Sequence, residues 1–164
     1  MTFTKLFAIL ALFSCTAFFC ACGGNGANQA NAPAASNKPA ENANIARSNA
    51  EELGVIVNLP FDTEDVAWKE DAAHKKVIAV LRFSPEDSAK VVAEAQKVRP
   101  PEPAVISTET WFPAELIAQS EMSGDDEIKG QSFSADQFFQ EPFTSGRVVR
   151  VETTDYFVLE LSAK

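Results

Sequence analysis

The placement of the cysteines most constrains how this chain can fold. All three cysteines of the 164-residue sequence lie within its first 22 residues. A disulfide framework, a cysteine-ligated metal site and a cysteine nucleophile are therefore excluded from residues 23–164. The region from Glu51 to Lys164 instead holds eight Phe, both Trp and the single Tyr, which is enough apolar material for one core.

The N-terminal residues have the pattern of a secretory signal. Met1–Lys5 carries one positive side chain, and Leu6–Ala21 is a run of sixteen uncharged residues rich in Leu, Phe and Ala. A basic start, an apolar run and closing small residues are typical of an export signal. The run is short for a membrane span, which requires about 20 apolar residues. An uncleaved signal anchor and plain secretion are the two alternatives.

The segment Phe19-Cys20-Ala21-Cys22-Gly23-Gly24 resembles the lipobox of bacterial lipoproteins. In that family a small residue precedes the cysteine that becomes the mature N-terminus and carries acyl chains, and Gly or Ser follows it. Ala21 and Gly23 match this pattern, whereas Phe19 stands where Leu is usual. The resemblance therefore assigns lipidation to Cys22. Because two or more acyl chains give stable attachment, it implies a protein anchored in the bacterial cell envelope.

Two other cysteines compete for this role. Cys15 follows a better-placed Leu but has a shorter apolar run before it, and Cys20 follows the bulky Phe19. Cys22 is preferred because the composition changes abruptly after it. In lipoproteins of bacteria with two membranes, Asp after the lipidated cysteine is associated with the inner membrane. Gly23 at that position favours the outer membrane.

Composition divides the chain into three parts: a signal peptide over residues 1–21, a lipidated cysteine with a tether over 22–49, and one domain over 50–164. Asn and Ala make up fifteen of the 27 residues of Gly23–Asn49, which cannot bury enough apolar surface to order itself. A helix over its Ala-rich end, Glu41–Glu52, is the alternative. The formal net charge of −9 argues against a nucleic-acid partner and leaves membrane contact to the lipid.

The domain is predicted to be α+β, with one small mixed or antiparallel sheet, two to three short helices on one face, and a C-terminal hairpin. The strongest strand is Lys75–Phe83, because its centre is apolar on both faces. Ser84 as a cap and Pro85 at the first helical position predict a helix that continues through Val98. The remaining elements are strands at Leu53–Leu59 and Ala104–Phe112, a helix from Pro113, a loop or short helix at Phe61–Ala73 with Trp68 packed inward, and a polar loop at Ser123–Gly130.

Two C-terminal segments carry more detailed predictions. Ser134 and Gln137 have the spacing of a capping box, so a short helix is expected within Phe133–Gln140. Arg147–Ser162 is predicted to be a hairpin whose odd-numbered residues face the core, which requires a three-residue turn at Thr153-Thr154-Asp155. The resulting pairs are Val151 with Phe157 and Val149 with Leu159.

The sequence contains few candidates for chemistry. His74 is the single histidine and is expected in a solvated turn rather than in a catalytic triad or metal site. The acidic runs Asp62–Asp71 and Asp125–Glu127 lack the spacing of a calcium loop. Two aromatic segments, Trp111–Pro113 and Glu141–Arg147, could line a partner site with Arg147 and Arg150 as anion contacts. The alternative is that these aromatics are core and that the arginines pair with Glu152 or Glu160.

These features favour a lipid-anchored binding or structural module of the cell envelope with a protein partner, and they imply no cofactor and no metal. An envelope hydrolase with paired carboxylates is the first alternative, because the spacing of such pairs is set in three dimensions. A protective or inhibitory lipoprotein with an acidic surface is the second alternative.

Overall fold

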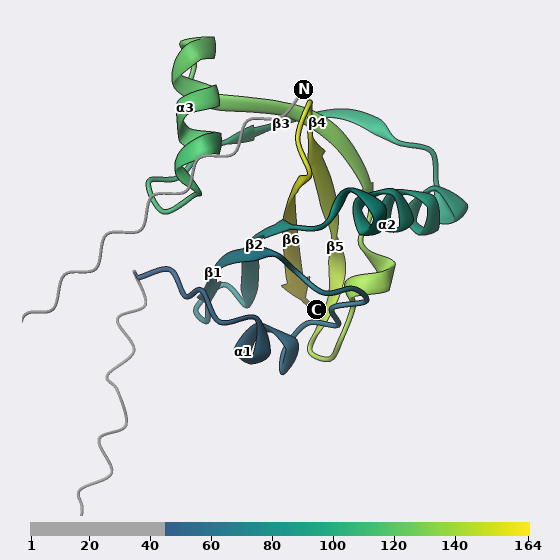
Figure 1. Ribbon diagram of the computed structural model, residues 1–164. Helices are drawn as coiled ribbons and strands as arrows, with labels where there is room; N and C mark the ends of the chain where they lie inside the picture. Colours follow the sequence, from purple (N-terminus) through teal and green to yellow (C-terminus); the bar gives the residue numbers. More distant parts are fainter. Residues whose placement is uncertain (1–44) are drawn as a thin grey trace, which may run out of the picture. The chain divides into compact units, whose positions relative to one another are not determined.

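The structure is a computed structural model that describes residues 45–164. Within this range, six strands form one antiparallel sheet accompanied by three α-helices and one short 3₁₀ helix (Figure 1). The strands are β1 (Asp65–Asp71), β2 (Lys76–Arg82), β3 (Glu102–Ser107), β4 (Glu127–Ser134), β5 (Phe143–Val151) and β6 (Tyr156–Ala163). The helices are α1 (Ala50–Gly54), α2 (Pro85–Val98), α3 (Ala114–Ser123) and the 3₁₀ helix η1 (Asp136–Phe138). The predicted α+β class and C-terminal hairpin are confirmed.

The strands lie across the sheet in the order β1-β2-β6-β5-β4-β3, and every neighbouring pair is antiparallel. After the β1–β2 hairpin, α2 carries the chain to the far edge, where β3 begins. The chain then returns as the meander β3-β4-β5-β6, and β6 pairs with β2. Strands β1 and β3 are therefore the two edges of the sheet.

Both faces of the central strands are buried. Ala79 of β2 lies opposite Leu159 of β6 on the first face, and Val80 lies opposite Val158 on the second face. The first-face core also includes Leu53 of α1, Val91 and Ala95 of α2 and Phe138 of η1, whereas the second-face core includes Leu116 of α3. The expectation that helices pack on one face only is wrong, because consecutive apolar residues in one strand require cover on both sides.

Helix α2 begins as its sequence predicts. The Ser84 hydroxyl accepts a hydrogen bond from the backbone N–H of Asp87 at 3.1 Å, and Pro85 is the first helical residue. The Ser84 hydroxyl and the Lys90 ammonium both donate hydrogen bonds to the Asp87 carboxylate. These bonds lower the pKa of Asp87, and the bond from Lys90 is the larger cause. The buried side holds Val91, and the opposite side carries the expected ion pairs, Lys90 with Glu86 and Lys97 with Glu94.

The strand predicted at Leu53–Leu59 is wrong, because this segment contains the end of α1 and a turn. The Asn49 side chain accepts hydrogen bonds from the backbone N–H groups of Glu51 and Glu52, which starts the helix. Leu53 is then buried while Val55 is 72% exposed. The alternation of apolar residues therefore gave the wrong prediction. The alternative, a helix over the Ala-rich end Glu41–Glu52, agrees better with the position of α1.

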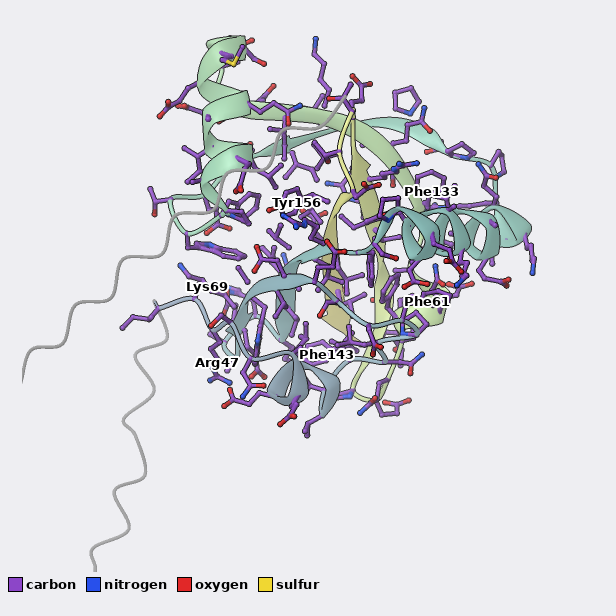
Figure 2. The ribbon with its side chains drawn as sticks, in the orientation of Figure 1. Arg47, Phe61, Lys69, Phe133, Phe143 and Tyr156 are labelled. Carbon is purple, nitrogen blue, oxygen red and sulfur yellow. The ribbon has the colours of Figure 1, made fainter. Side chains whose placement is uncertain are left out.

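Residues 65–71 form β1 rather than a loop or short helix, but Trp68 is packed inward as predicted and is 1% exposed. Arg47, which is labelled in Figure 2, pairs with Trp68 through two backbone hydrogen bonds of 2.8 and 2.9 Å. Its guanidinium carbon lies 4.7 Å from the Trp68 ring centroid. The Trp68 indole N–H donates to the carbonyl of Asn49 at 3.1 Å. The chain from Arg47 to Asn49 therefore covers the middle of the β1 edge.

The elements from β3 to η1 differ from prediction at their ends. β3 ends at Ser107 instead of Phe112, and α3 begins at Ala114, one residue later than predicted, with Pro113 as its cap. The predicted polar loop ends early, because β4 begins at Glu127. Ser134 closes β4, so its capping box with Gln137 is not formed and only the short η1 follows. The Gln137 amide instead donates to the carbonyl of Val91, which ties η1 to α2.

The C-terminal hairpin is present, but its predicted register is wrong. Val149 pairs with Val158, and Val148 pairs with Leu159. Four residues, 152–155, separate β5 from β6, whereas three were expected. Alternation could not determine the register, because Val148 and Val149 are both fully buried on opposite faces of the sheet.

A pair of glycine substitutions tests the close approach of β5 and β6. Gly146 has φ 149°, and a Cβ there would lie 2.1 Å from the Glu160 carbonyl oxygen. Gly146→Ala is expected to lower the free energy of unfolding by at least about 2 kcal/mol through backbone strain and overpacking. Gly54→Ala is the control, because nothing lies within 4 Å of the place its methyl group would occupy and helix propensity adds at most about 1 kcal/mol. Urea unfolding followed by tryptophan fluorescence measures both, and equal effects would contradict the packing.

Candidate functional site

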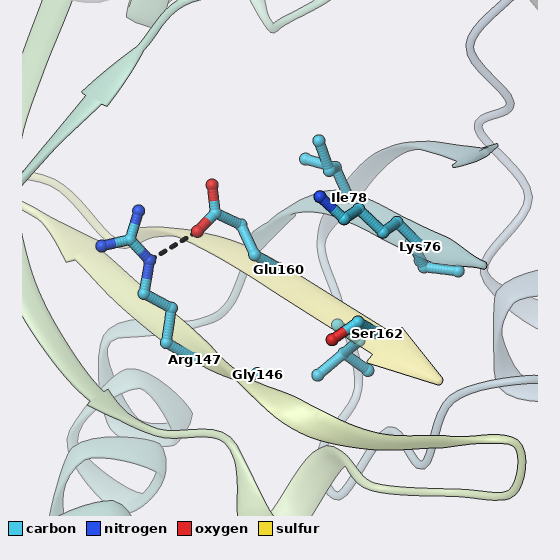
Figure 3. Close-up of a pocket in the computed structure, with 8 residues that line it drawn as sticks. Lys76, Ile78, Gly146, Arg147, Glu160 and Ser162 are labelled. Carbon is cyan, nitrogen blue, oxygen red and sulfur yellow. Dashed lines mark hydrogen bonds and ion pairs between the residues drawn. The ribbon is translucent and has the colours of Figure 1, made fainter. Parts of the chain in front are cut away.

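A groove on the second face of the sheet is a concave surface that combines polar and aliphatic side chains. It has a volume of about 400 Å³ and opens to solvent (Figure 3). We call it the sheet-face groove, and its lining residues are Lys76, Val77, Ile78, Gly146, Arg147, Glu160, Leu161 and Ser162. Strands β2, β6 and β5 contribute these residues.

The strand register explains why these side chains meet. Ile78, Glu160 and Arg147 form one row across β2, β6 and β5, because Ile78 pairs with Glu160 and Glu160 pairs with Arg147. In an antiparallel sheet, directly opposite residues project from the same face. Lys76 and Ser162 are likewise opposite each other in the next row. The groove is therefore the continuation of the second face beyond its apolar core.

Two charged side chains of the groove, Arg147 and Glu160, are paired with each other. The Arg147 Nε donates to Glu160 Oε2 at 2.5 Å, and Figure 3 shows the two side chains pointing toward each other. Their side chains are 40% and 34% exposed, so the pair stays in contact with solvent. In the next row, which contains Lys76 and Ser162, the hydroxyls of Ser145 and Ser162 are 2.9 Å apart. Together with the aliphatic Ile78, these groups suit a ligand that combines an apolar part with charged or hydroxyl groups.

The two arginines proposed as anion contacts are not brought together. Arg147 lies on the second face, whereas Arg150 lies in the row of Phe157 on the first face. Arg147 pairs with Glu160, as the alternative expected, but Arg150 bonds Asp155 at 3.4 Å instead of Glu152. A second hollow of about 300 Å³ adjoins Arg150, and its lining residues are Gln131, Arg150, Val151, Glu152 and Thr153.

The two aromatic segments belong to different cores. Phe112 is buried in the second-face core, and its ring meets that of Trp111 edge to face with centroids 4.7 Å apart. Phe143 is buried in the first-face core. Trp111 is half-buried, donates from its indole to Glu109 at 2.6 Å and carries the Lys69 ammonium 5.3 Å from its ring centroid. The core interpretation of these aromatics is therefore the one that the structure fits.

His74 lies in the turn between β1 and β2 and is exposed, as expected. Its ring Nδ1 is 2.5 Å from the Asp71 carboxylate, and its backbone N–H donates to the same carboxylate at 3.0 Å. These hydrogen bonds, above all that of the ring, lower the pKa of Asp71. His74 is not among the residues that line the sheet-face groove.

Among residues 45–164, no group of three or more His, Cys, Asp or Glu side chains is arranged to hold a metal ion. The residues of the two acidic runs lie in different elements. Asp65 and Asp71 are the first and last residues of β1, whereas Asp125 and Asp126 lie in the turn before β4. No helix in this range is long and apolar enough to cross a membrane. Cys22, the predicted lipidation site, and its rivals Cys15 and Cys20 lie outside the described residues.

Sequence reasoning missed most of the groove. The local sequence pattern predicts that Lys76 and Ile78 lie in a buried strand, and it suggests Glu160 as the partner of an arginine. It does not predict that these three residues lie together. Their meeting depends on the pairing of β2 with β6, which are more than 70 residues apart in the chain. A local pattern contains no signal for such a pairing.

Comparison with known proteins gives no relative: no family model, no curated protein and no solved structure matches the chain.

A double-mutant cycle tests whether the groove is open in solution. We expect Arg147→Met and Glu160→Gln to show a coupling of about 0.2–1 kcal/mol that falls with added salt, because both side chains are partly exposed. The helical pair Lys97 and Glu94, whose side chains are 67% and 52% exposed, is the control and should couple no more strongly. Urea unfolding gives both values, and a salt-independent coupling above about 2 kcal/mol would contradict an open groove.

Proposed function

We propose that this protein is a lipid-anchored component of the bacterial cell envelope, and that residues 50–164 are a binding or structural module for another envelope protein. The observation that carries the anchor is the apolar run Leu6–Ala21 followed directly by Cys22 and Gly23. An acyl-modified Cys22 at the mature N-terminus would attach the chain to a membrane surface. The Asn- and Ala-rich stretch behind it would act as a spacer with a reach of roughly 30 Å.

The binding role is supported by the chemistry of the sheet-face groove. Its residues offer two cations, an anion, a hydroxyl and aliphatic side chains within one open surface. The acidic net charge of −9 is consistent with a domain that stays in solution above the membrane. We place the protein at the outer membrane if the bacterium has two membranes, on the ground of Gly23.

The hydrolase alternative is less well supported. Glycoside chemistry with two carboxylates requires a pair on either side of the scissile bond. The described lining of the sheet-face groove includes one carboxylate, Glu160, and it bonds Arg147. The protective or inhibitory alternative uses the same anchor and requires a basic partner.

Mass spectrometry of the mature N-terminus tests the anchor. We expect a diacyl- or triacylglyceryl group on Cys22, and we expect Cys22→Ala to move the protein out of the membrane fraction or leave its leader uncleaved. Cys15→Ala and Cys20→Ala are the matched controls and should leave the modification unchanged. An unmodified Cys22 within an intact leader would refute the proposal.

A further inference from the structure

The two edges of the sheet differ in what covers them. At the β1 edge, Arg47 bonds the backbone of Trp68 in both directions. At the opposite edge, β3 pairs only with β4 among the described strands (Figure 1). An edge strand with unpaired N–H and C=O groups is a template for an added strand.

The hydrogen-bonding pattern identifies which β3 groups face outward. The N–H of Thr108 donates to the carbonyl of Asp126 at 2.8 Å, which continues the β3–β4 register. In an antiparallel ladder, residues that bond the partner alternate with residues that do not. Residues 102, 104 and 106 therefore bond β4, whereas the backbone groups of Pro103, Val105 and Ser107 point away from it. We call these outward groups the β3 edge.

The β3 edge is partly blocked and partly available. Pro103 has no N–H, so it offers only an acceptor at this edge. Because its backbone faces outward, the missing N–H does not remove a hydrogen bond between β3 and β4. Val105 and Ser107 each offer a donor and an acceptor, and no backbone group of the described chain is bonded to them. The Val105 side chain is 49% exposed although it lies in a strand. A short peptide could form two pairs of bonds at these residues.

The charge around the β3 edge indicates the kind of partner. Residues 99–129 contain seven acidic and two basic residues, which is more than half of the excess negative charge of the whole chain. Glu102 lies within β3, Glu127 pairs with Ser107, and Asp126 pairs with Thr108. Lys129, opposite Val105, is the one base on the facing strand. The surroundings of both ends of β3 are thus acidic.

We propose that the β3 edge binds an extended, basic segment of a partner protein as a seventh strand of the sheet. Backbone hydrogen bonds to Val105 and Ser107 supply the attachment, and the surrounding carboxylates select for Lys and Arg in the segment. A second copy of this chain would bring two acidic edges together, and that repulsion disfavours it. The inference rests on the proposed binding role but does not depend on the anchor at Cys22.

The experiment uses the full-length protein in nonionic detergent and synthetic peptides of about eight residues, a common strand length. The probe alternates Lys with Val, and an alternating Glu–Val peptide is its control. A third peptide carries N-methyl groups on the backbone nitrogens of both edges, which removes its donors without changing its charge. Fluorescence anisotropy gives the affinity, and hydrogen-exchange mass spectrometry locates the protected amides.

We expect the Lys–Val peptide to bind, to protect the segment with Val105 and Ser107 from exchange, and to lose affinity as salt is added. Val105→Pro should weaken binding at least tenfold, because it removes an outward N–H without breaking a bond to β4. Val105→Thr keeps the N–H and should bind within about threefold of the natural chain. Circular dichroism checks that each variant folds, and the N-methylated peptide tests the same bonds on the unaltered protein.

Charge variants complete the test. Asp126→Asn with Glu127→Gln should weaken binding and reduce its salt dependence, whereas Glu51→Gln with Glu52→Gln, on the distant α1, should change neither. Equal binding of the Glu–Val or the N-methylated peptide, or no binding of the Lys–Val peptide, would overturn the proposal. Self-association that strengthens with salt and disappears in Val105→Pro would assign the edge to a second copy instead. Cys22→Ala should bind the peptide normally, so failure of the anchor and failure of the β3 edge are distinguishable.

Discussion

The burial of β2, β6 and β5 on both faces is the constraint on which the rest of the structure depends. Each of these strands carries neighbouring apolar residues that project to opposite sides, as Val148 and Val149 do in β5. Burial of one such side chain contributes about 1.5–3 kcal/mol relative to exposure. The helices must therefore divide between the faces, with α1 and α2 on the first and α3 on the second. A domain without cysteine obtains its stability from these two cores.

The polar ends of the strands determine the register that the apolar centre leaves ambiguous. In the observed pairing, Arg147 and Glu160 lie opposite each other on the second face. A shift by one residue would place Glu160 opposite Val148 and separate it from Arg147. Gly146 adds a second constraint, because a side chain there would collide with the backbone of β6. The same residues that fix the hairpin thus also form the sheet-face groove.

Local signals predicted the parts of the fold that depend on local interactions. The start of α2 was predicted correctly, because a Ser cap and Pro85 act within one helical turn. Lys75–Phe83 was predicted as a strand buried on both sides, because its apolar run is long enough. Leu53–Leu59 was misassigned, because its apolar residues fit the period of a strand as well as that of an α-helix. The cap at Asn49 favours the helix. The groove and the β3 edge arise from pairings between distant strands, which no local pattern contains.

The sheet-face groove exists only if β5 and β6 pair as described, so the register of these two strands is its most direct test. Nuclear Overhauser effects between backbone protons of opposite residues report the pairing in solution. We expect cross-strand effects that link Val149 with Val158 and Val148 with Leu159. Effects that instead link Val149 with Leu159 and Val151 with Phe157 would contradict the two-faced sheet, the pairing of Arg147 with Glu160 and the groove that they form.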